Sequence, residues 1–299
     1  MLGDSHAEGY SVDFQDLFSE ALKRRLNKNG EKRYEVINAG TSAYSTDQEL
    51  LFFQNEGKKY QPDLTILVFS ANNVWFNNQT SMGRWQKPVF NLAAGELHLT
   101  HVPVPASKDP YNYKMRQFLK KSSYCCRFMY KAMIYSRPYF WLSQWGLTPF
   151  PERSRVWQRN YTPSLRDSWH LTEALLAKLK REVELSGSDF FVFYVPLPPT
   201  VYPEAWEETR EQYAMSDAEW DPLQDSRELA TICSRCRIDL LNPVQRFREI
   251  AIQRKGIGKK LYQFRDDHWT RDGHQVAGEI LLEYLTKNYI AAVPHRPSP

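Results

Sequence analysis

The sequence predicts an α/β protein in which helices cover both faces of a largely parallel sheet. Segments with strand-like and helix-like patterns alternate along the 299 residues, which is typical of doubly wound sheets. Two strand-like segments, residues 64–69 and 189–195, are nearly continuous apolar runs, as strands buried on both faces require. A hydrophobic content of 42% supplies the core for one large or two modest domains and argues against disorder.

The first half of the chain supplies the elements of one sheet edge. Residues 11–29 carry apolar side chains at helical spacing and end at an Asn-Gly pair, which predicts a helix. Residues 34–38 predict a short strand. A capping box that begins at Ser45 or Thr46 starts the next helix, and the apolar strand 64–69 follows it.

The second half resumes the same alternation. Residues 171–185 predict an amphipathic helix, and the buried strand 189–195 ends at a proline. A helix over 226–236, a short strand over 239–241 and a closing helix over 276–289 complete the pattern. We expect one domain over residues 1–290 and a flexible tail after it.

A long region, residues 76–170, interrupts the alternation and is expected to be an inserted or cap region. No acidic residue lies between Asp109 and Glu152, whereas lysine and arginine recur there. Apolar side chains over residues 115–133 repeat at helical spacing, which predicts an aromatic and basic helical insertion. Two interpretations stay open: a cap that packs on the sheet, or a contact through residues 111–161 with a membrane surface or an anionic polymer.

Charge and hydropathy exclude some classes of function. A formal charge of +4 is too mild to predict nucleic-acid binding. The sequence contains no apolar run of 18 residues, so it predicts no membrane span. Only Met1 and Leu2 precede a Gly-Asp-Ser turn, so we expect a missing N-terminal segment, which leaves cytoplasmic and extracytoplasmic locations both open.

Several loops are expected to meet beyond the carboxyl ends of the strands, where parallel sheets hold their ligands. Ser5, Gly40 and Asn72 each follow an early strand, and Asp266 and His268 precede the last helix. A serine hydroxyl becomes a nucleophile when a histidine takes its proton and a carboxylate orients that histidine. The oxyanion that forms needs preorganised donors, for which the Ser5 N–H, the Gly40 N–H and the Asn72 amide are the candidates.

The ordered set Gly3-Asp4-Ser5, Asn38-Ala39-Gly40, Asn72 and Asp266–His268 resembles the SGNH (GDSL) hydrolase family. The resemblance implies a flavodoxin-like three-layer α/β/α sandwich with a five-stranded parallel sheet. It also implies hydrolysis of an ester or thioester, or acyl transfer, through an acyl-enzyme and without a metal or other cofactor. The nucleophile, glycine donor, asparagine donor and base of the family fall on Ser5, Gly40, Asn72 and His268.

This sequence departs from the family pattern in two blocks. The third block reads Ser70-Ala71-Asn72-Asn73, without the usual glycine and following acid. The usual acid position, three residues before His268, holds Arg265, so Asp266 is our choice of orienting acid and Asp267 is the alternative. An Asp-x-His-Trp block is similar to a variant in members that act on polysaccharide acyl groups.

The leading hypothesis is therefore a serine esterase that cleaves a small-molecule ester or O-acyl groups on a carbohydrate. An O-acyltransferase acting on a glycan keeps the same site but changes the acceptor. A non-catalytic module that binds an anionic polymer or membrane surface is the third hypothesis. The oligomeric state is left open by the sequence.

Overall fold

The computed structural model describes residues 1–28, 32–82, 85–106, 152–255, 260–263 and 266–290, together with Pro138 and Leu142. Its centre is a five-stranded sheet in the order β2-β1-β3-β8-β9, in which every pairing is parallel. The strands are β1 (Leu2–Gly3), β2 (Ala39–Gly40), β3 (Leu64–Phe69), β8 (Asp189–Tyr194) and β9 (Asp239–Leu241). The predicted α/β fold with a five-stranded parallel sheet is confirmed.

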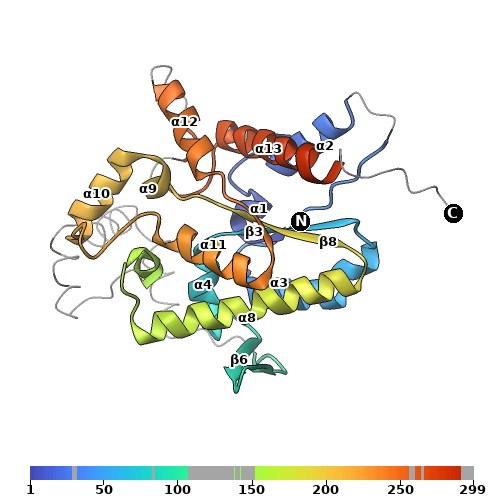
Figure 1. The fold of residues 1–299 in the computed structure, drawn as a ribbon, viewed down its shortest axis with the longest axis horizontal. Helices are drawn as coiled ribbons and strands as arrows, with labels where there is room; N and C mark the ends of the chain where they lie inside the picture. Colours follow the sequence, from blue (N-terminus) through green and yellow to red (C-terminus); the bar gives the residue numbers. More distant parts are fainter. Residues whose placement is uncertain are drawn as a thin grey trace, which may run out of the picture.

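Helices cover both faces of this sheet, which makes a three-layer sandwich (Figure 1). One layer contains α3 (Thr46–Asn55), α4 (Asn72–Phe76), α8 (Pro163–Leu185) and α11 (Gln224–Cys236). The opposite layer contains α2 (Phe18–Leu26), α12 (Val244–Arg254) and α13 (Arg271–Leu285). The strands divide their side chains between the two layers.

Alternation along the central strands builds the two cores. In β8, Val192 belongs to the core beneath α8, whereas Phe191 and Phe193 belong to the core beneath α13. All three are 0% exposed, because successive side chains of a strand point to opposite faces and both faces are covered. This double burial explains why the sequence of β8 is apolar without interruption.

Several helices begin earlier than their hydrophobic pattern predicts. The side chain of Thr162 caps α8 by accepting from the N–H of Leu165, and Pro163 occupies the first turn, where no N–H is needed. The predicted start at residue 171 missed this first part, in which Leu165 and Trp169 are buried and most other side chains are exposed. In the same way, Thr270 caps α13 by accepting from Gly273 N, so that helix begins at Arg271 rather than at residue 276.

The edge of the sheet differs from the prediction. The predicted strand 34–38 is not a strand, and β2 consists of the next two residues, Ala39–Gly40. The reason lies in its neighbour, because β1 offers only Leu2 and Gly3 as partners. The predicted helix 11–29 is likewise divided, into a 3₁₀ turn at Phe14–Asp16 and α2.

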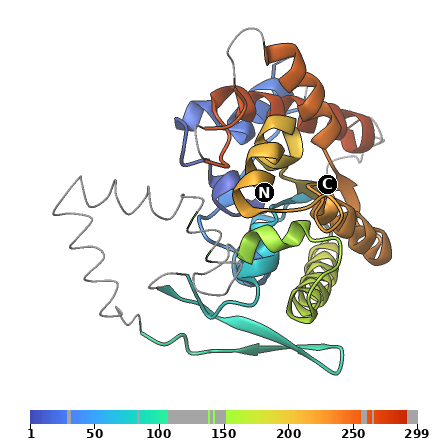
Figure 2. The same ribbon diagram turned by 90° about the vertical axis from the view of Figure 1, so that its left-hand side faces the viewer.

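The described part of the predicted insertion contains β-structure between residues 81 and 100 and helix in residues 152–157 and 163–170. Antiparallel pairs form between β4 (Ser81–Met82) and β5 (Trp85–Gln86) and between β6 (Val89–Ala93) and β7 (Glu96–Thr100). Figure 2 shows the longer hairpin as a teal arm that projects from the sandwich. The amphipathic segment expected over residues 115–133 lies outside the described residues, and α8 begins inside the region that was expected to be inserted.

A buried ion pair fastens this hairpin region to the sandwich. Lys87, between β5 and β6, is 3% exposed and pairs with Asp47, which is 0% exposed, in the first turn of α3. The ammonium also donates to Ser45 Oγ at 2.9 Å. Burial lowers the pKa of Lys87, while Asp47 acts in the opposite direction. The hairpin region is thus attached to the sandwich by a buried side-chain contact as well as by the backbone.

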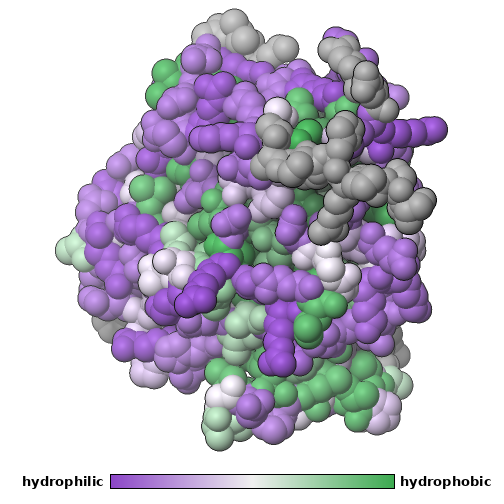
Figure 3. Space-filling view, turned by 45° about the vertical axis from the view of Figure 1, so that its right-hand side comes forward, coloured by the Kyte–Doolittle hydropathy of each residue, from purple (hydrophilic) through white to green (hydrophobic). Residues whose placement is uncertain are grey.

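The remaining described elements are short or peripheral. They are α1 (Ser5–Glu8), η2 (Gly57–Tyr60), η3 (Glu152–Trp157), α9 (Pro198–Val201), α10 (Pro203–Tyr213) and the π-helical turn Thr286–Ile290. Within the described ranges, no helix has both the length and the apolar composition that a membrane crossing needs. Figure 3 shows a largely hydrophilic face with hydrophobic side chains at its lower end, the end at which Figure 1 labels β6. A membrane or polymer contact through residues 111–161 stays a prediction.

Candidate functional site

Ser5 is the first residue of α1, directly after strand β1. Asp4 caps this helix, because its carboxylate accepts from the His6 N–H at 2.8 Å. Gly9 ends it in the left-handed region, at φ 67°. As the first helical residue, Ser5 has an N–H without an intrahelical acceptor. The short turn therefore presents both the hydroxyl and the N–H of Ser5 at the end of the strand.

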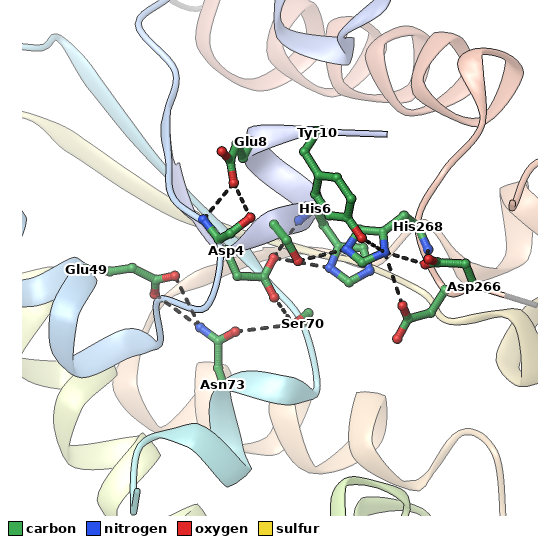
Figure 4. A network of polar contacts seen from close by, with 12 residues as sticks. Asp4, His6, Glu8, Tyr10, Glu49, Ser70, Asn73, Asp266 and His268 are labelled. Carbon is green, nitrogen blue, oxygen red and sulfur yellow. Dashed lines mark hydrogen bonds and ion pairs between the residues drawn. The ribbon is translucent and has the colours of Figure 1, made fainter. Parts of the chain in front are cut away.

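The structure brings Ser5, His268 and Asp266 into one chain of hydrogen bonds (Figure 4). Ser5 Oγ lies 2.8 Å from Nε2 of His268, and Nδ1 of His268 lies 2.5 Å from Oδ1 of Asp266. The His268 N–H also donates to Asp266 Oδ1 at 3.0 Å. These contacts join residues that are 263 positions apart in the sequence. This geometry suits transfer of the serine proton to the imidazole.

Asp266 and Asp267 are not equivalent toward the histidine. Asp267 Oδ1 lies 3.3 Å from His268 Nδ1, whereas Asp266 holds both the ring and the backbone of His268. Burial of Asp266 opposes ionisation, but the hydrogen bonds from His268 outweigh it and lower the pKa of this carboxyl. Of the two acids considered, Asp266 makes the closer contact.

The loop that carries His268 is anchored on both sides. Trp269 is 1% exposed and packs edge-on against Phe18, so it contributes to the core rather than to an open surface. Ser11 Oγ donates to the Trp269 carbonyl at 3.1 Å, and Gln263 N donates to the His268 carbonyl at 2.9 Å. These bonds hold the backbone of the loop and so fix the direction in which the His268 side chain points.

Gly40 does not present a free N–H to the site. Its N–H donates to Oδ1 of Asn38 at 2.9 Å. A Cβ at this position would lie 2.3 Å from Glu8 N and 2.6 Å from the carbonyl carbon of Ala7. The sequence predicted an oxyanion donor here. The structure instead indicates that glycine is needed because α1 and β2 approach each other closely.

The loop after β2 is held next to α1 by Glu8. The Glu8 carboxylate accepts from the Ser42 N–H at 2.7 Å and also from the Ser42 hydroxyl. The next residue, Ala43, has φ 69°, a left-handed conformation that is uncommon for alanine. Backbone strain of this kind often lies at functional sites. No signal in the sequence predicted this conformation, since a glycine would ordinarily mark such a turn.

Asn72 and Asn73 begin α4 and have different surroundings. Asn72 is half-buried on the loop that follows β3, the strand next to β1. Asn73 is fully buried and donates to Glu49 Oε2 at 3.1 Å. Burial, together with the nearby Asp4 and Asp47, raises the pKa of Glu49 well above its usual range. Glu49 of α3 thus places a buried acid against Asn73.

Ser70, directly after β3, connects this network to the turn that carries Ser5. Its hydroxyl donates to Asp4 Oδ2 at 2.6 Å, while the other carboxylate oxygen faces His6. Asp4 is 2% exposed, so this hydrogen bond is shielded from water. The residues that support Ser5 therefore include Ser70, His6 and Glu49, for none of which the sequence predicted this role.

Three side chains come close enough together to be considered as metal ligands. Among the described residues, His6, Asp267 and His268 have potential ligand atoms within 4.8 Å of one another. However, the two imidazoles are stacked with their planes 17° apart, which directs their in-plane lone pairs side by side rather than toward a common point. His6 Nδ1 also faces Asp4, and His268 is bonded to Ser5 and Asp266. The donor set is a poor fit to a tetrahedral ion.

A polar cleft of about 420 Å³ lies beside the histidine loop. Its rim includes Tyr10, whose hydroxyl is 3.4 Å from His268 Nδ1 and whose ring meets His268 edge-on. Arg271 Nε pairs with Asp16 Oδ1 at 2.9 Å on another side. The lining residues are Tyr10, Ser11, Val12, Asp13, Asp16, Gln263 and Arg271. The cleft is therefore bordered mainly by groups that can form hydrogen bonds.

Comparisons with known proteins give distant likenesses only. No family model matches the chain, and no curated protein matches it significantly. Among solved structures, TesA is 13% identical, with 96% of each chain covered and a TM-score of 0.46. The acetyl xylan esterase AlAXEase is 10% identical, with 95% of this chain and 96% of that chain covered and a TM-score of 0.49. A lipase/acylhydrolase from Enterococcus faecalis is 13% identical, with 96% and 94% covered and a TM-score of 0.46.

Proposed function

We propose that this protein is a serine esterase of the SGNH (GDSL) type. The observation that carries the proposal is the contact of 2.8 Å between Ser5 Oγ and His268 Nε2, continued by Asp266 on the other ring nitrogen. A hydroxyl, a base and an orienting acid in this order are the parts of an acyl-transfer site. The ordered sequence blocks that contain these residues point to the same chemistry.

In the proposed reaction, Ser5 Oγ attacks the acyl carbonyl and passes its proton to Nε2 of His268. Asp266 accepts the Nδ1–H and stabilises the imidazolium. His268 then protonates the leaving alcohol oxygen as the ester bond breaks, which leaves an acyl group on Ser5. Water attacks the acyl-enzyme while His268 takes its proton, and collapse of this second intermediate releases the acid and restores the Ser5 hydroxyl.

The oxyanion requires donors at the Ser5 end of the site. We assign the Ser5 N–H and the Asn72 amide to this role, as the sequence predicted. From the loop after β2, we assign the N–H of Ala43 in place of the N–H of Gly40. Nearby N–H groups of this loop already have acceptors: Gly40 donates to Asn38, Ser42 to Glu8, and Tyr44 to the Thr41 carbonyl. These donor and acceptor pairs are all among the described residues.

The polar cleft bears on the alcohol part of the substrate. Because His268 protonates the leaving oxygen, the alcohol must lie on the histidine side of Ser5, and this is the side on which Tyr10 borders the cleft. A cleft lined by carboxylates, Gln263 and Arg271 favours a polyhydroxylated alcohol over a lipid. We therefore propose that the substrate is a sugar ester. The cleft would bind its sugar through the aromatic ring at the rim and the planar polar groups beyond that ring.

Replacing Arg271 with alanine is expected to raise KM for an acetylated oligosaccharide about tenfold, because a charge-assisted hydrogen bond contributes roughly 1.5–3 kcal/mol. Turnover of p-nitrophenyl acetate, whose alcohol part has no sugar hydroxyl groups for Arg271 to bind, should change less than about twofold. Arg235→Ala is the matched control, since Arg235 is also an exposed, ion-paired arginine but lies on α11. Equal effects of both variants on the sugar ester would contradict the assignment.

The same assay distinguishes hydrolysis from transfer. Acetate release and acetylation of an added oligosaccharide are measured together by mass spectrometry. Release that is unaffected by the acceptor supports an esterase, whereas an acceptor that captures most of the acyl groups supports an O-acyltransferase.

A fluorophosphonate probe tests the nucleophile itself. The wild-type protein is expected to be labelled on one peptide, the one that contains Ser5, because an activated serine attacks phosphorus as it attacks an acyl carbon. Ser5→Ala should remain unlabelled, and Ser42→Ala, which changes the nearby hydroxyl, should still react. A folded wild-type protein that takes up no probe would exclude the esterase and favour a non-catalytic binding module.

A further inference from the structure

A second imidazole lies against the candidate base. The rings of His6 and His268 are stacked, with centroids 4.6 Å apart and planes 17° from parallel. His6 is 2% exposed and directly follows Ser5 on α1. A buried histidine in this position is not needed to cap the turn, because the backbone N–H of His6, rather than its ring, makes the capping bond to Asp4. The ring is thus available for a different task.

The surroundings of His6 favour a positive charge. Nδ1 of His6 lies 3.2 Å from Asp4 Oδ1, and both side chains are shielded from water. Burial alone would lower the pKa of His6. The Asp4 carboxylate and then Asp267 outweigh burial and raise the pKa of His6 to about 9. The buried contact with Asp4 therefore suits an imidazolium better than a neutral ring.

Other charged and titratable groups face this pair from the neighbouring elements. From the histidine loop, Asp266 and Asp267 approach the His268 ring. From α13, His274 lies close enough to both imidazoles to be affected by their charge. Burial, and to a smaller extent these two rings, lowers the pKa of His274 to about 4, so it stays neutral. From the end of α1, the Tyr10 hydroxyl meets His268 Nδ1. Among these described groups, His6 is the one that adds a positive charge at the face of His268.

We propose that His6 is a positioning residue, a buried imidazolium whose charge and stacked ring hold His268 in its neutral, proton-accepting form. Two adjacent positive charges repel each other, so the imidazolium of His6 disfavours protonation of His268 from solvent. The same repulsion helps His268 to give its proton to the leaving alcohol after it has taken that proton from Ser5. While both rings are charged, the Asp266 carboxylate limits the electrostatic repulsion by stabilising the imidazolium of His268.

This inference rests on the proposed esterase activity and predicts how that activity depends on pH. Removal of the His6 charge should move the acidic limb of the profile to higher pH by about one unit. At pH 6 this shift corresponds to a loss of up to about tenfold, while at pH 8 the rates should agree within about threefold.

Two substitutions separate the charge from the ring. His6→Phe keeps a flat ring against His268 and removes the charge, and His6→Gln keeps a donor for Asp4 and also removes the charge. His170→Gln, at an exposed histidine of α8, is the matched control and should leave the profile unchanged. All four proteins are assayed with p-nitrophenyl acetate from pH 5 to 9, after circular dichroism has shown that they are folded.

Each outcome decides the proposal. A shift of the acidic limb in both His6 variants supports it, and an unchanged limb in a folded variant overturns it. Loss of kcat without a shift in His6→Gln alone would show that only the ring matters, which also overturns the role of the charge. If neither variant folds, NMR of the histidine rings in the wild-type protein is decisive: a His6 ring that is neutral at pH 7 overturns the proposal. A wild-type protein without esterase activity rejects the proposed function, and the NMR titration then still reports on His6 separately.

Discussion

Replacing His268 with glutamine is expected to lower kcat by about 10⁴- to 10⁶-fold, with a far smaller change in KM. Without the imidazole at 2.8 Å, the Ser5 hydroxyl has no base to take its proton, and the leaving alcohol has no acid. The remaining rate would come from substrate binding and the oxyanion donors. The measurement is steady-state hydrolysis of p-nitrophenyl acetate, with labelling by a fluorophosphonate as a second readout.

The two acids next to His268 provide the graded controls for this prediction. Asp266→Asn is expected to lower kcat by about 10²- to 10⁴-fold, because an amide does not stabilise the imidazolium and can favour the wrong tautomer. Asp267→Asn should cost less than about tenfold, since its longer contact to Nδ1 is that of a partly exposed ion pair. A larger effect for Asp267 than for Asp266 would reverse the assignment, and a fully active His268→Gln would refute the base.

Replacing Gly40 with alanine is expected to reduce both stability and activity. The new methyl group would lie 2.3 Å from Glu8 N and 2.6 Å from the Ala7 carbonyl carbon, and these backbone atoms cannot turn aside as a side chain can. We expect the free energy of unfolding to fall by about 2–3 kcal/mol. Because α1 carries Ser5, its displacement should also lower kcat/KM by roughly 100-fold. Urea denaturation and the ester assay measure the two effects.

Gly57→Ala is the control for the loss of a glycine as such. The nearest atoms to its added Cβ belong to the side chain of Phe53, at 3.0 Å, and they can adjust. Its unfolding free energy should stay within about 1 kcal/mol of the wild type, with activity retained. A Gly40→Ala protein that is as stable and active as the Gly57 control would show that α1 and β2 do not require their close approach.

The fold and the meeting of Ser5, His268 and Asp266 could be predicted because their signals are local. A strand buried on both faces, such as β8, is recognisable from its continuous apolar run. Once the strands are placed, the topology of a parallel sheet requires that Ser5, Asn72 and the His268 loop approach the same edge. Short strands were harder to predict. The extent of β2 depends on its pairing with the two residues of β1 rather than on a pattern in its own sequence.

The supporting contacts could not be predicted, because they depend on side chains that meet only after folding. Glu49 looked like an ordinary helix residue, yet it is the acid that binds Asn73. Gly40 fitted the role of a donor, but its N–H is taken by Asn38, two residues before it. His6 carried no signal beyond its position after Ser5. In each case the decisive fact is the partner, and no periodicity or motif in the sequence names it.

The ion pair between Lys87 and Asp47 has a consequence for how this protein can be altered or can diverge. A buried charge that loses its partner destabilises a protein by about 3–5 kcal/mol, so neither residue can be exchanged alone. A chimera that receives the hairpin of another protein must therefore receive a matching residue at position 47 as well. In the history of such proteins, the arm and the start of α3 are expected to be inherited, lost or replaced together, as one module.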